Sequence, residues 1–209
     1  MFESKELRRG NVTLRVANGH FATTHSHINY YIDITSQKTR LADAKAVAAE
    51  MAKNYSNVQV DTILCMDGMT LVGACLAEAL TASRHSVSDA NTICVVDPEY
   101  RDGGQIIFRD NIQPSIRNKN VLILMASITT GYTANRGINA IRHYGGNVVG
   151  VTGIYRAVDE MEDDSVNVTS VYTMADLPDY QSYAQHKCPL CKSGRRIDAM
   201  INTFGYSKM

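Results

Sequence analysis

The chain has 209 residues, of which 44% are hydrophobic and 20% charged, a composition that suits one globular domain with a core of its own. Lysine plus arginine equals aspartate plus glutamate, so the net charge is zero, and a nucleic-acid binder that depends on neutralising phosphates is not expected. The first ten residues are charged and the longest apolar run, 121–128, is too short to span a bilayer, so we expect a cytoplasmic protein without membrane contact and with reduced cysteines.

The predicted elements alternate between strands and helices. Residues 12–16 and 30–34 are β-rich, and apolar residues recur at helical spacing over 41–55. The remaining pattern predicts, in chain order, a strand at 60–66, a helix at 70–80, strands at 92–96, 105–108 and 121–125, a helix at 133–144, and strands at 147–154 and 166–171. Near-continuous apolar strands that alternate with helices indicate an α/β fold, with a mostly parallel sheet covered on both faces. After residue 172 we expect an irregular polar tail.

The most informative segment joins the strand at 121–125 to the helix at 133–144, and it contains Thr129, Thr130, Gly131 and Thr133. In an open α/β sheet, ligands bind where the strands end, and a helix that begins there offers unpaired backbone amides and the positive end of its dipole. Three hydroxyls and a small glycine make this segment a cradle suited to a phosphate monoester. The alternative is a threonine-capped helix start without a ligand.

Five segments along the chain carry motifs in a distinctive order. Residues 121–151 read strand, Thr-Thr-Gly-x-Thr, helix, Gly-Gly turn and strand, and residues 20–33, which include Phe21, Tyr31 and Asp33, resemble the pattern Phe-x-Leu-x-Ser-Gly-x-x-Ser-x-x-Tyr-x-Asp. Residues 61–80 and 96–104 follow core strands, and residues 188–191 read Cys-Pro-Leu-Cys. Together they resemble the type I phosphoribosyltransferases, and orotate phosphoribosyltransferases in particular. In that family these segments are the phosphoribosyl-pyrophosphate (PRPP) motif, the hood, the pyrophosphate loop, the mobile loop and the ending of some members.

The resemblance implies a phosphoribosyltransferase type I fold with an N-terminal hood at 1–40, a core at 41–172 and a C-terminal tail at 173–209 that packs on the hood or the core. It also implies a homodimer that takes PRPP with Mg²⁺. The family's reaction, part of pyrimidine nucleotide metabolism, transfers the 5-phosphoribosyl group to orotate or another nitrogenous base and releases pyrophosphate.

Matching positions imply where such a site lies. The PRPP-binding residues would be Ser127, Thr129, Thr130, Gly131, Tyr132, Thr133 and Gly68; the base-binding residues of the hood would be Phe21, His25 and Tyr31; and the catalytic candidates are Asp67 and Arg101.

Several charged residues of the family are replaced. The two acids that precede the threonine loop, which hold the ribose and stabilise an electron-poor sugar, are here Met125 and Ala126. Of the cations in the mobile loop, only Arg101 remains. Asp67 is the best-placed remaining acid, although it is equally interpretable as a helix-start cap. The sequence therefore predicts either a phosphoribosyltransferase with reduced or lost activity, or a non-catalytic sensor of PRPP or a nucleotide.

Cys188 and Cys191 have the spacing that lets two thiolates bind one tetrahedral metal, so they are candidates for a structural Zn²⁺ site. Such a closed site needs four ligands, and the chain has no second Cys-x-x-Cys. His186 is a candidate third ligand, and a twofold-related chain could complete a four-thiolate site. The alternative is a pair of reduced thiols that pack in the tail.

Overall fold

A computed structural model describes residues 4–24, 26–82, 92–158 and 164–209. Its centre is a five-stranded sheet in which every neighbouring pair is parallel, in the order β10-β9-β8-β4-β5. The strands are β4 (Thr62–Cys65), β5 (Cys94–Val96), β8 (Asn120–Ile128), β9 (Asn147–Arg156) and β10 (Val168–Thr173). The predicted parallel sheet is thus confirmed, because strands buried on both faces need apolar residues at nearly every position.

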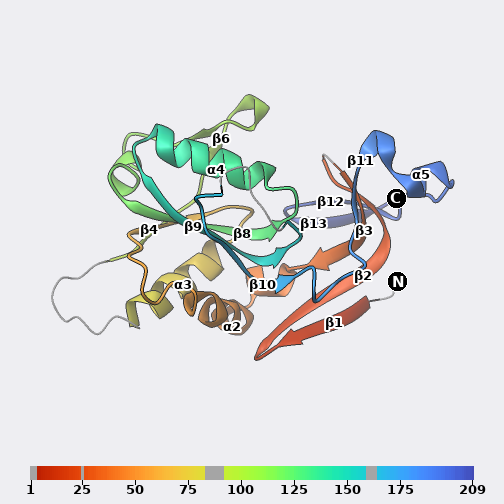
Figure 1. The fold of residues 1–209 in the computed structure, drawn as a ribbon, viewed down its shortest axis with the longest axis horizontal. Coiled ribbons are helices and arrows are strands. Elements are labelled where there is room, and N and C mark those ends of the chain that lie inside the picture. Colours follow the sequence, from red (N-terminus) through yellow and green to blue (C-terminus); the bar gives the residue numbers. More distant parts are fainter. Residues whose placement is uncertain (1–3, 25, 83–91, 159–163) are drawn as a thin grey trace.

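Helices cover both faces of this sheet (Figure 1). One face carries α2 (Leu41–Ala52) and α3 (Thr70–Ala82), which follow the single-turn helix α1 (Thr35–Thr39). The other face carries α4 (Tyr132–His143), whose stripe Ala134, Ile138 and Ile141 is buried against the strands. That stripe has the spacing of one helix face, so the pattern that predicted this helix also determines which side faces the core. Among the described residues, no helix is long and apolar enough to cross a membrane.

A second sheet joins the two ends of the chain. It has six strands in the order β11-β3-β2-β12-β13, with β1 added to β2. The strands are β1 (Ser4–Arg9), β2 (Val12–Ala22), β3 (Ser26–Asp33), β11 (Ser182–Ala184), β12 (Ala199–Asn202) and β13 (Gly205–Lys208). The expectation of an irregular tail was therefore wrong for three segments after residue 172. The strand β11 pairs with the edge of β3, β12 pairs with β2, and β13 then pairs with β12, because an open strand edge has backbone groups that need partners.

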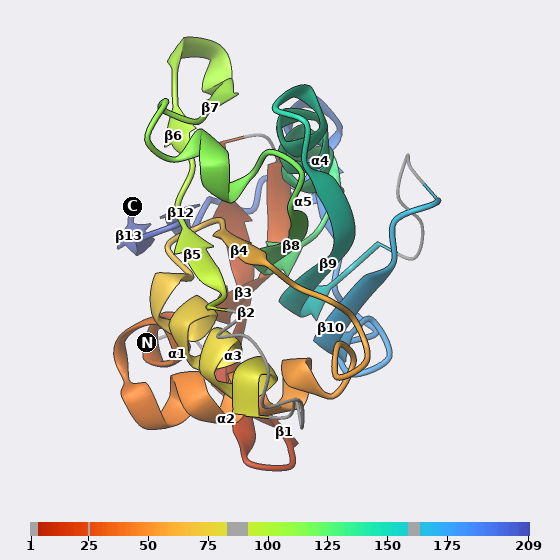
Figure 2. The ribbon, with the colours of Figure 1, turned by 90° about the vertical axis from the view of Figure 1, so that its left-hand side faces the viewer.

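Short elements complete the structure. The strands β6 (Glu99–Tyr100) and β7 (Ile106–Ile107) form a small hairpin that lies beyond one end of the main sheet (Figure 2). The tail contains the four-residue helix α5 (Pro189–Lys192), and three 3-10 turns occur at Asp102–Gly104, Gln113–Ser115 and Gln185–Lys187.

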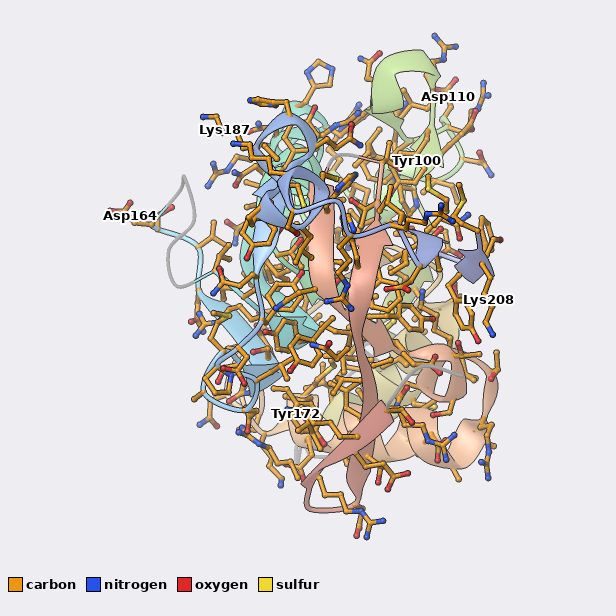
Figure 3. The ribbon with its side chains drawn as sticks, turned by 90° about the vertical axis from the view of Figure 1, so that its right-hand side faces the viewer. Tyr100, Asp110, Asp164, Tyr172, Lys187 and Lys208 are labelled. Carbon is orange, nitrogen blue, oxygen red and sulfur yellow. The ribbon has the colours of Figure 1, made fainter. Side chains whose placement is uncertain are left out.

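Buried tyrosine hydroxyls connect the two sheets. The hydroxyl of Tyr172 in β10, a residue labelled in Figure 3, lies 2.8 Å from the Val12 carbonyl oxygen and 3.1 Å from that of Leu7 in the N-terminal hairpin, so its one proton is shared between two acceptors. The core cluster that contains Tyr172 is also continuous from the second sheet into α2 and α3. The second sheet is therefore anchored to the core rather than attached only through the chain.

Candidate functional site

The predicted phosphate cradle lies between the end of β8 and the start of α4. Gly131 is the N-cap of α4 and has φ 74°, in the left-handed region where a side chain would cost about 1–2 kcal/mol. No side-chain cap bond is present at that N-cap, so the alternative of a threonine-capped helix start is wrong. Within the part of the chain that the structure describes, the amides of Thr129, Thr130 and Gly131 donate no hydrogen bond. Free amides at a helix start are suited to an anion.

A cavity of about 450 Å³ opens beside this loop. Its wall combines the loop, the ends of the core strands and the second sheet, through Ser26, Thr129, Thr130, Ala157, Met174, Tyr180, Gln181, Ser182, Tyr183 and Ala184. About half of the lining surface is polar, and the described residues that form it include neither lysine nor arginine. Any anion held there would depend on amides and hydroxyls rather than on side-chain cations.

The turn after β4 adds an acid near the same strand end. Asp67 has φ 56° and Gly68 has φ 73°, so two consecutive residues are left-handed. The backbone amide of Ala126 in β8 donates to the Asp67 carboxyl. Burial raises the pKa of Asp67, against the opposing effects of the Lys38 ammonium and the Ala126 amide. This carboxyl therefore contacts β8 as well as lying in the turn before α3.

Lys38 is a site residue that the sequence did not reveal. It lies on α1, and its Nζ donates to the Thr203 carbonyl oxygen at 2.9 Å in the turn between β12 and β13. Burial lowers its pKa, and the nearby Asp67 carboxylate opposes that effect. No local signal marks Lys38, since only the tertiary fold brings α1, the tail and the Asp67 turn together.

Met125 and Ala126 are both buried, 3% and 7% exposed, and lie two to three residues before β8 ends. Their side chains belong to different core clusters, Ala126 to the one shared with the second sheet and Met125 to the one under α4. No charge is available from either position.

The remaining PRPP-binding candidates belong to the start of α4 or to β8. Ser127 is the next-to-last residue of β8, while Tyr132 and Thr133 open α4. Tyr132 is 56% exposed, and the Arg136 guanidinium lies over its ring, 5.6 Å from the ring centroid. Arg136, which sequence reasoning missed, also donates to the Gly103 carbonyl oxygen at 3.1 Å and so ties α4 to the β6–β7 hairpin.

Arg101 lies in the turn of that hairpin and is exposed. Its backbone amide donates to Gln105 at 2.9 Å, and its carbonyl oxygen accepts from Gly104 at 2.8 Å. Arg101 does not line the cavity beside the phosphate loop.

The predicted base-binding residues of the second sheet lie deeper than expected. Phe21 is 0% exposed, and its ring centroid lies 6.1 Å from that of Tyr31, which is also buried. Burial raises the pKa of Tyr31 to about 12. His25 lies outside the described residues. The side of the hood that faces the cavity is instead formed by Ser26 and the tail residues 180–184.

The cysteine pair is placed beside two histidines of the hood. Cys188 and Cys191 lie next to His20 of β2 and His27 of β3. His186 is not in this group. Neither histidine was recognised as a ligand from the sequence, because more than 160 residues separate them from the cysteines.

Comparisons with known proteins agree with this architecture. The chain is 27% identical over 186 residues to an orotate phosphoribosyltransferase of Chlorobium phaeobacteroides, covering 87% of this chain and 86% of that one. It is 24% identical over 202 residues to the orotate phosphoribosyltransferase of Chlorobaculum parvum, covering 95% of each chain. No family model matches the chain.

Solved structures support the same fold. The orotate phosphoribosyltransferase of Mycobacterium tuberculosis in complex with PRPP superposes with a TM-score of 0.51 at 19% identity, covering 70% of this chain and 82% of that one. The chain is therefore a divergent relative of the orotate phosphoribosyltransferases, built on the type I phosphoribosyltransferase fold.

Proposed function

We propose that this protein binds PRPP with Mg²⁺ and transfers the 5-phosphoribosyl group to orotate or another nitrogenous base, at a rate reduced by the replaced charged residues. The observation that carries the proposal is the set of free amides at Thr129, Thr130 and Gly131 beside a cavity whose lining is about half polar. The homodimer and the cytoplasmic location expected from the sequence are part of the same proposal.

The residues present fit the phosphate group well. In this proposal the 5-phosphate lies on the loop amides and the hydroxyls of Thr129, Thr130 and Thr133, with Ser127 and Tyr132 at its edges. The base lies under the hood, for which the sequence assigns Phe21, His25 and Tyr31. Phe21 and Tyr31 would support that site from behind, because both are buried.

Fewer residues are available to hold pyrophosphate and Mg²⁺ than to hold the 5-phosphate. Asp67 and Gly68 would lie nearest to pyrophosphate, with Arg101 approaching from the hairpin. Asp97, which accepts a hydrogen bond from the Thr70 hydroxyl at 2.8 Å, is a second carboxylate near this turn. Carboxylate oxygens are suitable Mg²⁺ ligands, and the metal would neutralise the departing pyrophosphate.

Reduced turnover follows from the buried, apolar character of Met125 and Ala126. Loss of one strong electrostatic contributor commonly costs about 10²–10³ in rate. Binding depends on a different loop, so it should be affected much less than transfer. The same observation favours a second candidate function, a sensor that binds PRPP or a nucleotide without turnover.

The test measures binding and turnover in parallel. Calorimetric titration with PRPP and Mg²⁺, and with nucleoside 5′-monophosphates, is combined with pyrophosphate release across a panel of bases. Binding with turnover supports the enzyme, and binding without turnover supports the sensor. Absence of binding to PRPP and to every nucleotide would contradict both.

A matched pair of glycine variants makes this test specific. Gly131 and Gly145 have the same left-handed backbone conformation, with φ 74° and 78°, at the two ends of α4. Gly131→Ala should weaken PRPP binding by about tenfold or more, since misdirecting one amide removes a charge-assisted hydrogen bond worth ~1.5 kcal/mol or more. Gly145→Ala imposes similar backbone strain away from the cavity and should leave affinity unchanged.

A further inference from the structure

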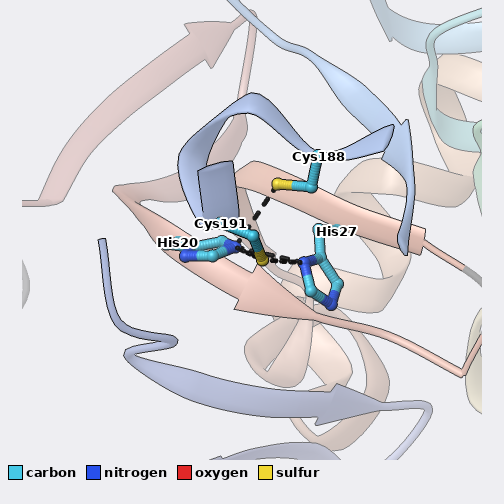
Figure 4. A group of neighbouring side chains, drawn as sticks. All are labelled: His20, His27, Cys188 and Cys191. Atoms are coloured by element: carbon cyan, nitrogen blue, oxygen red, sulfur yellow. Dashed lines mark hydrogen bonds between the residues drawn. The ribbon is translucent and has the colours of Figure 1, made fainter. Parts of the chain in front are cut away.

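Four side chains from distant parts of the sequence converge beside the hood (Figure 4). His20 and His27 come from the β2–β3 hairpin, and Cys188 and Cys191 come from the short helix α5 and the residue before it. The ligand atoms of all four lie within 4.8 Å of one another. Histidine and cysteine are the residues that most often bind zinc. Two of each meet here, and neither segment alone predicts it.

Four of the six separations between the ligand atoms lie close to the edges of a tetrahedron around a metal ion, and the other two are at most 4.8 Å. His20 Nε2 lies 3.2 Å from His27 Nδ1, 3.5 Å from Cys188 Sγ and 3.6 Å from Cys191 Sγ, and Cys191 Sγ lies 3.2 Å from His27 Nδ1. Zinc bonds of about 2.0–2.3 Å place tetrahedral ligand atoms about 3.3–3.8 Å apart. Hydrogen bonds explain this less well, because His20 Nε2 carries at most one proton and faces three partners.

Contacts outside the cluster prepare His20 as a ligand. Its Nδ1 lies 2.9 Å from the Arg195 carbonyl oxygen and 3.2 Å from that of Arg196. A carbonyl oxygen only accepts, so Nδ1 carries the proton and Nε2 presents its lone pair to the cluster. The His20 amide also donates to Asp198 Oδ2 at 2.7 Å, which fixes the backbone of the same residue.

The hairpin explains why both imidazoles face the cysteines. Ala22 pairs directly with His27 across the two strands, and His20 lies two residues before Ala22. Residues opposite one another, and residues two apart, project from the same face of a sheet. The register also shifts between Asn18 and Phe21, a β-bulge of the kind that redirects a side chain.

We propose that each chain binds one Zn²⁺ through His20, His27, Cys188 and Cys191, as a closed structural site. The second pair of ligands comes from the same chain, so the completion by a twofold-related chain considered from the sequence is not needed. Three of the four residues are buried and Cys191 is exposed, which leaves an entry path for the ion.

The ion would fasten the tail to the wall of the ligand cavity. His27 pairs with Tyr183 of β11, and its neighbour Ser26 pairs with Ala184. Ser26, Tyr183 and Ala184 all line the cavity beside the phosphate loop. Zinc at this point therefore holds the hood side of the cavity in place without contacting the ligand itself.

Elemental analysis of the purified full chain tests the stoichiometry. We expect one zinc per chain in the wild type and in the control His186→Ala, which removes a neighbouring histidine that lies outside the cluster. His27→Ala and Cys191→Ser should lose most of their zinc on dialysis against a chelator that spares the wild type. Half an equivalent per chain, loss of zinc in His186→Ala, or a metal-free wild type with freely titrating thiols would each overturn the proposal.

Cobalt replacement tests the ligand set on the wild-type protein itself, so the main result does not depend on whether a variant folds. Wild-type protein in which Co²⁺ replaces the zinc should show the strong visible absorption of tetrahedral cobalt, together with a thiolate-to-cobalt charge-transfer band. Cys191→Ser should weaken that band, and His186→Ala should not. The weak spectrum of octahedral cobalt in the wild type would contradict a closed site of two histidines and two cysteines.

Discussion

Ala126→Asp restores one missing acid at a position where the structure allows its effect to be calculated. The side chain of Ala126 is 7% exposed, and its backbone amide donates to the Asp67 carboxyl, whose pKa is already raised by burial. Because the Ala126 amide contacts the Asp67 carboxyl, a carboxylate on residue 126 would be its close neighbour. At an effective dielectric constant of about 20, two charges about 5 Å apart repel by ~3 kcal/mol.

The isosteric variant Ala126→Asn isolates that charge, because both variants introduce the same volume. We expect Ala126→Asp to have a free energy of unfolding ~2–3 kcal/mol lower than Ala126→Asn at neutral pH. Two adjacent carboxylates raise each other's pKa in the folded protein. The deficit is therefore present at neutral pH and is lost as the pH falls through the raised pKa.

Urea unfolding at pH 5 and pH 7, with and without Mg²⁺, measures this difference. A hard cation bound between the two carboxylates should restore much of the stability of Ala126→Asp and leave Ala126→Asn unchanged. In the double variant Met125→Asp, Ala126→Asp, any residual pyrophosphate release should rise. Equal stability of Ala126→Asp and Ala126→Asn at pH 7 would refute the placement of residue 126 beside Asp67.

Three further predictions concern the core and the acid turn. Tyr55→Phe should lower the free energy of unfolding by about 1–2 kcal/mol in urea denaturation, because the buried hydroxyl lies 3.0 Å from Thr169 Oγ1. The half-buried Asp67 carboxyl should lower the stability of the wild type as the pH rises from its unfolded pKa to its raised folded pKa, and Asp67→Asn should lack this fall. Melting temperatures of the two proteins from pH 4 to pH 7 measure the difference, and a parallel pH dependence in both would contradict a raised pKa. Gly73→Ala should lower the free energy of unfolding by about 1–3 kcal/mol, because the added Cβ would lie 2.3 Å from the buried Cys65 Sγ. An unaltered melting temperature would contradict that packing.

The sequence was sufficient for the core and for the position of the phosphate loop. Apolar runs and helical periodicity record which residues are buried, and this local information predicted the parallel sheet and the helices α2, α3 and α4. The position of the loop between β8 and α4 was predictable for the same reason, because it follows from the order of the elements.

Pairing between distant segments was decided only by the tertiary structure. Periodicity does not state which edge a polar segment will join, so the tail strands β11, β12 and β13 were missed. The approach of Lys38 to Asp67 has the same cause, as does the meeting of His20 and His27 with the two cysteines. Each of these contacts joins two segments that carry no local signal for it. The segments meet only when the long stretch of chain between them closes during folding.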